Sequence, residues 1–455
     1  MHIHFIGICG TFMAGLARLA LELGHQVTGS DREFYPPMSD QLVDMGVKTY
    51  RGFEADIWDV INPDLVIVGN ICSRGMPIIE AMLEKKLNYT HGPQWLGEQV
   101  LKNRYVFAIA GTHGKTTTTA MLTHILRENG IDTGYLVGGV VPGFGNSSAL
   151  GSSSHGDGYF VIEADEYDSA YFDKRPKLLH YEPDTLVIGN VEFDHADIYD
   201  NVEQIERQFH YGVRLVPPSG TAIFGRGEHV IKVRDQGVWS NVIDLNEGDY
   251  VLNDGSITQH NRLVAKLPQH IIGIHNQTNA MIACLAAQQA GINWSQSGCA
   301  LATFKGVKRR LELLAEINGI AVYDDFAHHP TAVELTLTAM RERFPDRRLV
   351  SVLEPRSNTM RMGEHAEQLP AVLATADRSY VYLPEAIQWQ LAGNSIVEDS
   401  IDRLLLRLSD ELRSGDIVVM MSNGSFEGLH GRLIKALRPI RTGRPDNKNT
   451  GNLSL

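Results

Sequence analysis

A short run between residues 110 and 118 combines the residue types that bind phosphate. It reads Ala-Gly-Thr-His-Gly-Lys-Thr-Thr-Thr and contains Lys115 and Thr116. The apolar run 106–110 leads into it, and a helix-like run, 118–127, follows it. In a strand, loop and helix of this kind, loop N–H groups and the helix N-terminus face the anion, the lysine reaches the outer phosphates and the Thr hydroxyl takes Mg²⁺. The run therefore predicts a nucleotide phosphate site.

The loop is a shortened variant of the usual G-x-x-x-x-G-K-S/T motif. That motif would need glycine at position 109, where this chain has Ile109. The alternative is a tight turn before a helix that binds nothing. Packing does not explain why Lys-Thr-Thr stands at the start of a helix, whereas a phosphate site does, so the phosphate site is favoured. The loop residues concerned are Gly111, Thr112, His113, Gly114, Lys115, Thr116 and Thr117.

Acidic and imidazole side chains follow two other apolar runs of the same region. Glu163-Ala-Asp-Glu166 ends one of them, and Asp194-His195 follows the run 186–190. Open α/β sheets place ligands at the carboxyl ends of their strands. A carboxylate at such an end, beside a phosphate loop, suits a Mg²⁺ ligand. The alternatives are a solvated acidic loop and a structural histidine; the strand ends favour a metal or phosphate site.

The N-terminal segment offers a second phosphate-binding turn. A dinucleotide fingerprint is G-x-G-x-x-G with an acidic residue about 20 positions further on. Asp31 meets the last condition, but Cys9 occupies the second glycine position, so the fit to an NAD site is incomplete. The turn better suits a nucleotide or nucleotide sugar, and the alternative is a purely structural turn. The residues concerned are Gly7, Cys9, Gly10, Thr11, Phe12, Met13 and Asp31.

Polar clusters continue in the second half of the chain. Asn276 and Asn279 stand before an Ala-rich helix-like run; their amides suit an adenine edge, and equally they suit helix caps. Arg310 belongs to a basic run that would reach a bound phosphate or stay solvated. Asp325 and His328 belong to a group of two carboxylates and two imidazoles after an apolar run. The two neighbouring aspartates argue against a pair of histidines that only fills a core.

The last cluster, Glu354-Pro-Arg-Ser-Asn-Thr359, ends another apolar run. Arg356 offers a guanidinium, and Asn358 and Thr359 add amide and hydroxyl donors. A guanidinium binds a carboxylate through two parallel hydrogen bonds. The cluster therefore suits an incoming substrate that carries carboxylates.

These clusters need a scaffold, and the remaining sequence supplies one. The chain has 455 residues, of which 43% are apolar, and this length suggests about three domains. Short apolar runs alternate with helix-like stretches, which predicts α/β domains on largely parallel sheets. We expect a Rossmann-like domain over 1–103, a phosphate-loop domain over 104–307, a Rossmann-like domain over 308–440 and a flexible polar tail over 441–455.

Charge and cysteine content narrow the class of protein. The net charge of −13 makes nucleic acid and anionic membranes poor default partners. The four cysteines are scattered without a C-x-x-C pair, which indicates reduced thiols in a cytoplasmic protein. A signal peptide is not expected, because the N-terminus lacks a basic start and a longer apolar core. A membrane span is not expected either, because no apolar run approaches about 20 residues. We expect a monomer or a weak homo-oligomer.

Together the motifs resemble those of one family, the Mur ligases. Members are three-domain, ATP-dependent enzymes that form amide bonds in peptidoglycan assembly. The resemblance extends from Gly7 to the turn at 422–428. The motifs that carry it are the phosphate loop, Glu163-Ala-Asp-Glu166, Asn190 with Asp194-His195, His275-Asn276 with Asn279, and Asp324-Asp-Phe-Ala-His-His-Pro330. It implies ATP and Mg²⁺ as cofactors and UDP-N-acetylmuramate as a substrate.

Within the family two amine substrates are considered. The runs 7–13, 35–38, 92–95 and 354–360 resemble those of members that add a whole murein tripeptide, L-alanyl-γ-D-glutamyl-meso-diaminopimelate, during cell-wall recycling. The alternative is the ligase that adds L-alanine, which has a glycine-richer first turn and an aromatic and Arg-rich run in place of 354–360. More distant alternatives are an NAD-dependent oxidoreductase, which leaves the phosphate-loop lysine without a role, and a regulatory nucleotide-binding protein.

The resemblance also implies residue roles. The residues implied to bind ATP are the loop residues from Gly111 to Thr117, together with Asn276, Asn279, Arg310 and Asp325. Those implied in catalysis are Lys115, His195 and His328, and those implied to hold Mg²⁺ are Thr116, Glu163 and His195. The first glycine turn would hold UDP, and Arg356, Asn358 and Thr359 would meet the peptide. The muramyl carboxylate would attack the γ-phosphorus of ATP, and the peptide amine would then attack the resulting acyl phosphate.

Overall fold

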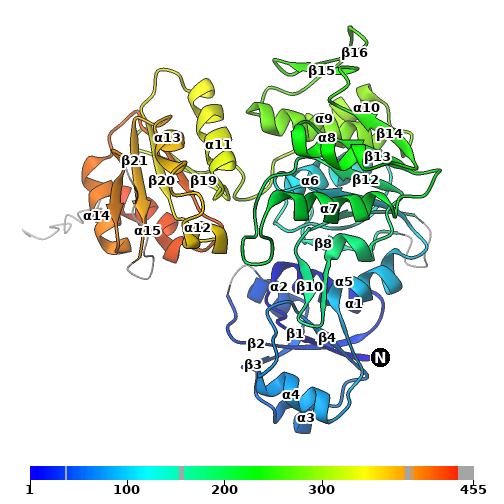
Figure 1. Cartoon of the computed structure of the whole chain (residues 1–455). Helices are drawn as coiled ribbons and strands as arrows, with labels where there is room; N and C mark the ends of the chain where they lie inside the picture. The colour runs from blue at the N-terminus through cyan, green and yellow to red at the C-terminus, as the bar shows by residue number, and fades with distance from the viewer. Residues whose placement is uncertain (36–37, 153–157, 385–390, 392, 439–455) are drawn as a thin grey trace, which may run out of the picture.

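The computed structural model describes residues 1–35, 38–152, 158–384, 391 and 393–438. The predicted tail over 441–455 lies outside the described residues. The described chain forms three domains, each on its own largely parallel sheet, as the predicted α/β class requires. Figure 1 shows the N-terminal domain in blue, the central domain in cyan to green and the C-terminal domain in yellow to red.

The N-terminal sheet has the strand order β3-β2-β1-β4-β5, and its neighbouring strands run parallel. The order reverses between β1 and β4, so the turns after these two strands open at a switch point, where such sheets bind ligands. The strands are β1 (His2–Ile6), β2 (Gln26–Asp31), β3 (Lys48–Arg51), β4 (Leu65–Val68) and β5 (Tyr89–His91). The helices are α1 (Thr11–Glu22), α2 (Met38–Asp44), α3 (Ile57–Val60), α4 (Pro77–Glu84), α5 (Gly92–Leu96) and η1 (Gly97–Leu101).

The central sheet has the order β14-β13-β12-β6-β9-β7-β8, with the pair β7–β8 antiparallel. The strand that precedes the phosphate loop, β6, lies inside the sheet between β12 and β9. The strands are β6 (Tyr105–Ala110), β7 (Gly134–Leu136), β8 (Ser148–Ala149), β9 (Tyr159–Glu163), β12 (Thr185–Ile188), β13 (Thr221–Phe224) and β14 (Asn241–Asp244). The helices are α6 (Lys115–Glu128), α7 (Val202–Val213), α8 (Glu228–Asp235), α9 (Ile274–Gln288) and α10 (Trp294–Leu301).

Two smaller antiparallel pieces extend from the central domain. The hairpin of β10 (Asp168–Ala170) and β11 (Asp173–Pro176) leads into η2 (Lys177–His180) and reaches the N-terminal domain, where Phe172 packs on Tyr89. A separate sheet at the far end of the domain has the order β15-β16-β17. Its strands are β15 (Tyr250–Asn253), β16 (Ser256–Gln259) and β17 (Arg262–Lys266).

The C-terminal sheet has the order β18-β19-β23-β20-β21-β22 and is parallel apart from the edge strand β18. Its strands are β18 (Glu312–Ile317), β19 (Ile320–Asp325), β20 (Leu349–Leu353), β21 (Arg378–Tyr382), β22 (Ile396–Glu398) and β23 (Ile417–Met421). Its helices are α11 (Pro330–Arg343), α12 (Asn358–Met362), α13 (Leu369–Leu373), α14 (Ile401–Glu411), η3 (Phe426–Gly428) and α15 (Leu429–Leu437).

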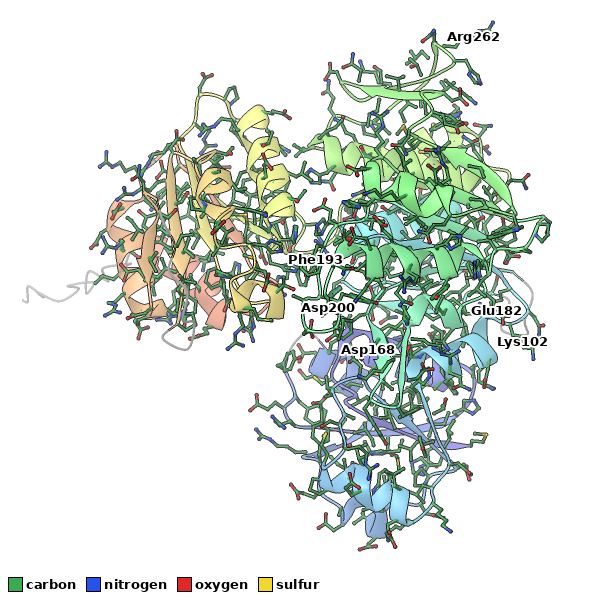
Figure 2. All side chains as sticks on the ribbon, viewed as in Figure 1. Lys102, Asp168, Glu182, Phe193, Asp200 and Arg262 are labelled. Carbon is green, nitrogen blue, oxygen red and sulfur yellow. The ribbon has the colours of Figure 1, made fainter. Side chains whose placement is uncertain are left out.

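The N-terminal and central domains share an apolar core, whereas the C-terminal domain has its own. Phe5 of the first domain and Phe160 of the second belong to one cluster of buried side chains. The clusters of the C-terminal domain draw on residues from 311 onward. In Figure 2, Asp168 lies where the central and N-terminal domains meet. Phe193 lies on the side of the central domain that faces the C-terminal domain. The junction with the C-terminal domain therefore has less apolar contact to hold it and is the more easily opened.

No helix in the described part of the chain has the length and apolar character that a membrane crossing needs.

Candidate active site

The phosphate loop is shaped by its two glycines. Gly111 has φ 136° and Gly114 has φ 80°, a backbone region that favours glycine. A Cβ atom on Gly114 would lie 2.6 Å from Asn279 Oδ1, so the loop lies tightly against the start of α9. Helix α6 begins at Lys115, three residues earlier than the apolar pattern predicted, because Gly114 serves as its N-cap. The free N–H groups of its first turn therefore face the loop.

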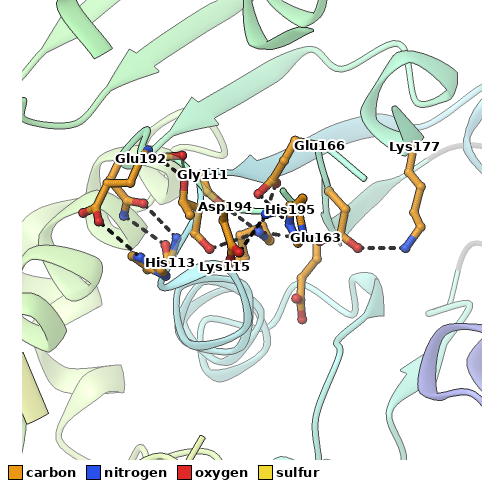
Figure 3. Close-up of polar contacts among 12 residues, drawn as sticks. Gly111, His113, Lys115, Glu163, Glu166, Lys177, Glu192, Asp194 and His195 are labelled. Atoms are coloured by element: carbon orange, nitrogen blue, oxygen red, sulfur yellow. Dashed lines mark hydrogen bonds and ion pairs between the residues drawn. The ribbon is translucent and has the colours of Figure 1, made fainter. Parts of the chain in front are cut away.

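The side chain of Lys115 is 13% exposed and is surrounded by carboxylates. Its Nζ donates to Gly111 O at 2.6 Å and to Glu166 Oε2 at 3.1 Å, and it lies 3.7 Å from Asp165 Oδ1 (Figure 3). Burial lowers the pKa of Lys115, but the charges of Glu166 and Asp165 outweigh it and raise this pKa to about 12. The ammonium group is therefore charged at neutral pH and held at the mouth of the loop.

The two predicted metal positions lie around this lysine. Thr116 Oγ1 donates to Glu163 Oε2 at 2.9 Å, and the Gly138 N–H donates to Glu163 Oε1. His195 Nε2 lies 3.3 Å from Glu166 Oε1. Burial and the neighbouring Asp165 raise the pKa of Glu163. Burial lowers the pKa of His195, but the hydrogen bond and charge of Glu166 raise it overall.

Glu166 and Asp165 are site residues that the sequence reasoning did not single out. Glu166 contacts both Lys115 and His195, and Asp165 Oδ2 accepts from Lys177 Nζ at 3.0 Å. Both carboxylates belong to the Glu163-Ala-Asp-Glu166 run, so the signal was present. The residues that they contact could not be predicted from the sequence, because contacts between distant segments depend on how β9 packs against the loop.

The first cavity, of about 230 Å³, lies between the phosphate loop, α9 and the C-terminal domain. Several residues that were predicted to bind the nucleotide line this cavity: His113, Gly114, Thr117, Asn276, Asn279, Arg310 and Asp325. His328 lies outside this lining: its Nδ1 is 3.0 Å from Phe326 O, and burial lowers its pKa to about 4. Its imidazole is therefore neutral at physiological pH.

Hydrogen bonds with the backbone hold two of the predicted side chains of this cavity, Asn276 and Asp325. Helix α9 begins at Ile274 with Gly273 as N-cap, so neither predicted asparagine caps it. Asn276 lies in the first turn and its Nδ2 donates to Ile272 O at 3.0 Å. Asp325 accepts backbone N–H groups on both oxygens, from Leu311 at 2.7 Å and from Ala327 at 2.8 Å. These bonds hold the end of β19 rigidly at the cavity wall.

A second cavity, also of about 230 Å³, lies at the switch point of the N-terminal sheet. Predicted residues that line it are Gly7, Gly10, Thr11, Phe12, Met13 and Asp31. Cys9 does not line it: the side chain is buried and the thiol lies 3.8 Å from Tyr35 O. The Cys9 N–H donates to Asp31 at 2.8 Å, so Asp31 holds the turn in place.

The central domain completes this second cavity. Ser169 and Lys177 contribute to its lining, and Lys177 Nζ lies 5.2 Å from the centre of the Phe12 ring. Neither residue was predicted, because both lie more than 150 positions from the glycine turn and come from the segment that follows β9. No motif connects the two segments.

The predicted peptide residues lie on the C-terminal domain. Thr359 Oγ1 donates to Asp194 Oδ1 at 2.9 Å, so this hydroxyl joins the C-terminal and central domains. The Arg356 side chain is half exposed and its Nη1 lies 3.7 Å from Glu354 Oε1. Asn358 begins α12, and its side chain lies outside the described residues. Arg356 is thus the predicted peptide residue whose charged group is accessible to a ligand.

Comparisons with known proteins agree across the whole chain. Three family models match consecutive segments: "Mur ligase family, catalytic domain" over 2–104, "Mur ligase middle domain" over 109–287 and "Mur ligase, glutamate ligase domain" over 309–424. A UDP-N-acetylmuramate–L-alanyl-γ-D-glutamyl-meso-2,6-diaminoheptandioate ligase of Haemophilus influenzae is 43% identical, covering 96% of this chain and 99% of that protein. The Escherichia coli protein of the same name is 44% identical, covering 96% and 98%.

Solved structures give the same picture. A murein peptide ligase from Psychrobacter arcticus is 42% identical and superposes with a TM-score of 0.75, covering 97% of this chain and 99% of that one. A UDP-N-acetylmuramate–alanine ligase from Thermotoga maritima, at 21% identity, shares the fold with a TM-score of 0.78, covering 96% and 98%. With family models over most of its length and such relatives, the chain belongs to the Mur ligase family.

Proposed function

We propose that this ligase uses ATP to join the tripeptide L-alanyl-γ-D-glutamyl-meso-diaminopimelate to UDP-N-acetylmuramate. The names of its 43–44% identical relatives support these substrates. One structural observation carries the proposal. Lys177, which lines the N-terminal cavity, pairs with Asp165, and Asp165 in turn lies 3.7 Å from Lys115 of the phosphate loop. A carboxylate on a ligand of the N-terminal cavity would thus come close to the outer phosphate of a nucleotide on the loop.

ATP would occupy the first cavity with its phosphates on the loop. Asn276 and Asn279 would lie near adenine and Asp325 near the ribose, while Arg310 would face phosphate. Arg310 stacks on Phe326 at 4.8 Å from the ring centre, which holds the guanidinium plane toward the cavity. UDP would occupy the second cavity, with its diphosphate on the turn from Gly7 to Gly10.

The Thr116 hydroxyl and the Glu163 carboxylate fit Mg²⁺. Both offer oxygen, the donor that Mg²⁺ prefers, and they lie 2.9 Å apart beside Lys115. Burial and the charge of Asp165 raise the pKa of Glu163, and a bound cation would offset both effects. When bound, Mg²⁺ would neutralise phosphate charge. A second ion would lie at His195, where Glu166 supplies an oxygen beside the imidazole.

The chain's own residues would then position and stabilise the reacting groups. The muramyl carboxylate attacks the γ-phosphorus, ADP leaves, and an acyl phosphate forms. The amine of the tripeptide attacks the acyl carbon, and phosphate leaves with the two electrons of the broken C–O bond. Lys115 would stabilise the charge on the transferred phosphoryl group, the dominant need in such a step. His328 would lie near the reacting groups as a neutral imidazole, because its pKa is about 4.

Isotope transfer tests the reaction directly. With oxygen-18 in the muramyl carboxylate, we expect labelled inorganic phosphate and stoichiometric ADP, formed when both UDP-N-acetylmuramate and the tripeptide are present. Mass spectrometry of the phosphate provides the measurement. Stoichiometric AMP and pyrophosphate would instead show an adenylate route and contradict the proposal. ADP release that needs neither acceptor would favour a nucleotide-binding protein with another role.

The metal assignment predicts altered Mg²⁺ dependence. Glu163→Gln and His195→Ala should each raise the Mg²⁺ concentration that gives half-maximal activity, because each removes a proposed ligand. Titration of the initial rate with Mg²⁺ provides the measurement. Glu228→Gln and His260→Ala, at exposed positions outside the site, serve as matched controls and should leave the titration unchanged. The same Mg²⁺ requirement in both site variants as in the wild-type chain would rule the assignment out.

A further inference from the structure

A cluster of imidazoles lies where the central and C-terminal domains meet, and the proposed reaction does not use its ring nitrogens. His113 belongs to the phosphate loop, and Glu192 follows β12. His329 precedes α11 on the C-terminal domain. His113 Nε2 lies 3.5 Å from Glu192 Oε2, and His329 Nδ1 lies 3.6 Å from the same oxygen. Figure 3 shows His113 facing Glu192 across the loop. His365 stacks edge-on against His329 with ring centres 4.5 Å apart.

The nitrogens of this cluster are buried without hydrogen-bond partners. Within the described residues, this holds for His113 Nε2, for both ring nitrogens of His329 and for both of His365. The side chain of His329 is 7% exposed. Buried polar atoms in native proteins nearly always have a protein, water or ligand partner. So many unpartnered nitrogens around one carboxylate indicate a ligand that binds between them.

The charges of the cluster favour a cation. Burial, together with the neighbouring His113, lowers the pKa of His329, and burial lowers the pKa of His365. Both imidazoles therefore keep free lone pairs at neutral pH. Burial by itself raises the pKa of Glu192, but the neighbouring His113, whose Nε2 lies 3.5 Å away, lowers it overall, so this carboxylate is ionised. Asp194 adds a second negative charge close to His329 and His365. Two carboxylates beside the uncharged His329 and His365 attract a cation.

The spacing matches the coordination sphere of one metal ion. The ligand atoms of His113, Glu192 and His329 all lie within 4.8 Å of one another. Bonds of about 2.0–2.2 Å in a tetrahedral site place ligand atoms about 3.3–3.6 Å apart, so a small contraction would suffice. Two imidazoles and a carboxylate are a donor set of zinc-type ions, whereas Mg²⁺ prefers oxygen.

We propose that His113, Glu192 and His329 form a site for one divalent transition-metal ion of the zinc class, bridging the central and C-terminal domains. It is separate from the proposed Mg²⁺ positions at Thr116, Glu163 and His195. Ligands from two domains mean that a bound ion holds these domains in the arrangement of Figure 1. Its binding therefore stabilises the full chain.

Co²⁺ serves as a visible probe. The full-length protein, freed of metal with a chelator and kept in saturating Mg²⁺, is titrated with Co²⁺. We expect one Co²⁺ per chain with the strong visible absorption of a four-coordinate ion, displaced by Zn²⁺, and a rise in Tm. His329→Gln and Glu192→Gln should each weaken Co²⁺ binding at least about tenfold and abolish the rise in Tm, since even residues that only support a ligand change affinity by about 10- to 100-fold.

Two further variants make the result decisive. His260→Gln removes an exposed histidine outside the cluster and should bind Co²⁺ as the wild-type chain does. His195→Ala should also retain the Co²⁺ spectrum, because His195 is not a ligand of this site. Circular dichroism confirms folding, and His113→Gln replaces either cluster variant that does not fold. Unchanged Co²⁺ affinity in the cluster variants, or loss of the spectrum in His195→Ala alone, would overturn the proposal.

Discussion

Lys115→Ala should lower the rate of ligation at least about 10²-fold, on the scale of removing one preorganised charge-stabilising group. Its ammonium group is charged, because Glu166 and Asp165 hold its pKa at about 12. Phosphates on the loop would replace these carboxylates as partners. Alanine leaves the developing phosphoryl charge without this cation, so kcat should fall more than the KM for ATP rises.

The fold should survive this substitution. Removing one partner of a buried ion pair strongly lowers the free energy of unfolding when the other charge is left without a partner. Here Glu166 keeps His195 at 3.3 Å, and Asp165 keeps Lys177 at 3.0 Å, so both carboxylates retain a partner. Steady-state ADP formation measures the rate, and thermal melting monitored by circular dichroism measures stability. Lys232→Ala, on the exposed face of α8, is the matched control. A folded Lys115→Ala protein that turns over at nearly the wild-type rate would contradict the role of this lysine.

The strands were the most predictable part of the fold. The apolar run 106–110 lies in strand β6 (Tyr105–Ala110), and the run 186–190 covers most of strand β12 (Thr185–Ile188). A parallel strand buried on both faces needs a short, unbroken apolar run, and such runs are visible in a sequence. Helix α6 was less well predicted, because its first turn contains threonines rather than an apolar stripe. There the conformation of Gly114, not the apolar pattern, determines where the helix begins.

The site was predictable motif by motif, but not as a set of contacts. The glycine turns and the strand ends indicated where ligands would bind, and their roles stay predictions until they are tested. The sequence did not reveal that Glu166 lies between Lys115 and His195, or that Lys177 reaches the cavity of another domain. Such contacts depend on how β9 and the following hairpin pack against segments far away in the chain. Composition and spacing carry no information about that packing.

The choice between tripeptide and L-alanine rests on the C-terminal domain. The tripeptide carries several carboxylates at a distance from its amine, whereas L-alanine has one beside it. Arg356 is half exposed and lies three residues before Thr359, whose hydroxyl bonds Asp194 of the central domain. Its guanidinium can pair with such a distant carboxylate. We therefore expect kcat/KM for the tripeptide to exceed that for L-alanine at least about 10²-fold, because each hydrogen bond to a charged group contributes about 1.5–3 kcal/mol. Parallel assays with the two amines measure this ratio. If L-alanine is the better substrate, the tripeptide assignment is wrong.

The position of Arg356, and not merely its charge, should matter for the tripeptide. Gly424 lies under this side chain: a Cβ atom there would overlap Arg356 Cδ. Gly424→Ala should therefore displace the guanidinium without removing it. Arg356→Ala should raise the KM for the tripeptide about 10- to 100-fold with little change in the KM for ATP. Gly424→Ala should also raise the KM for the tripeptide. Arg361→Ala, which removes an exposed arginine of α12, is the matched control. Equal effects of all three variants, or a rise in the KM for ATP in place of that for the tripeptide, would show that Arg356 does not bind the peptide.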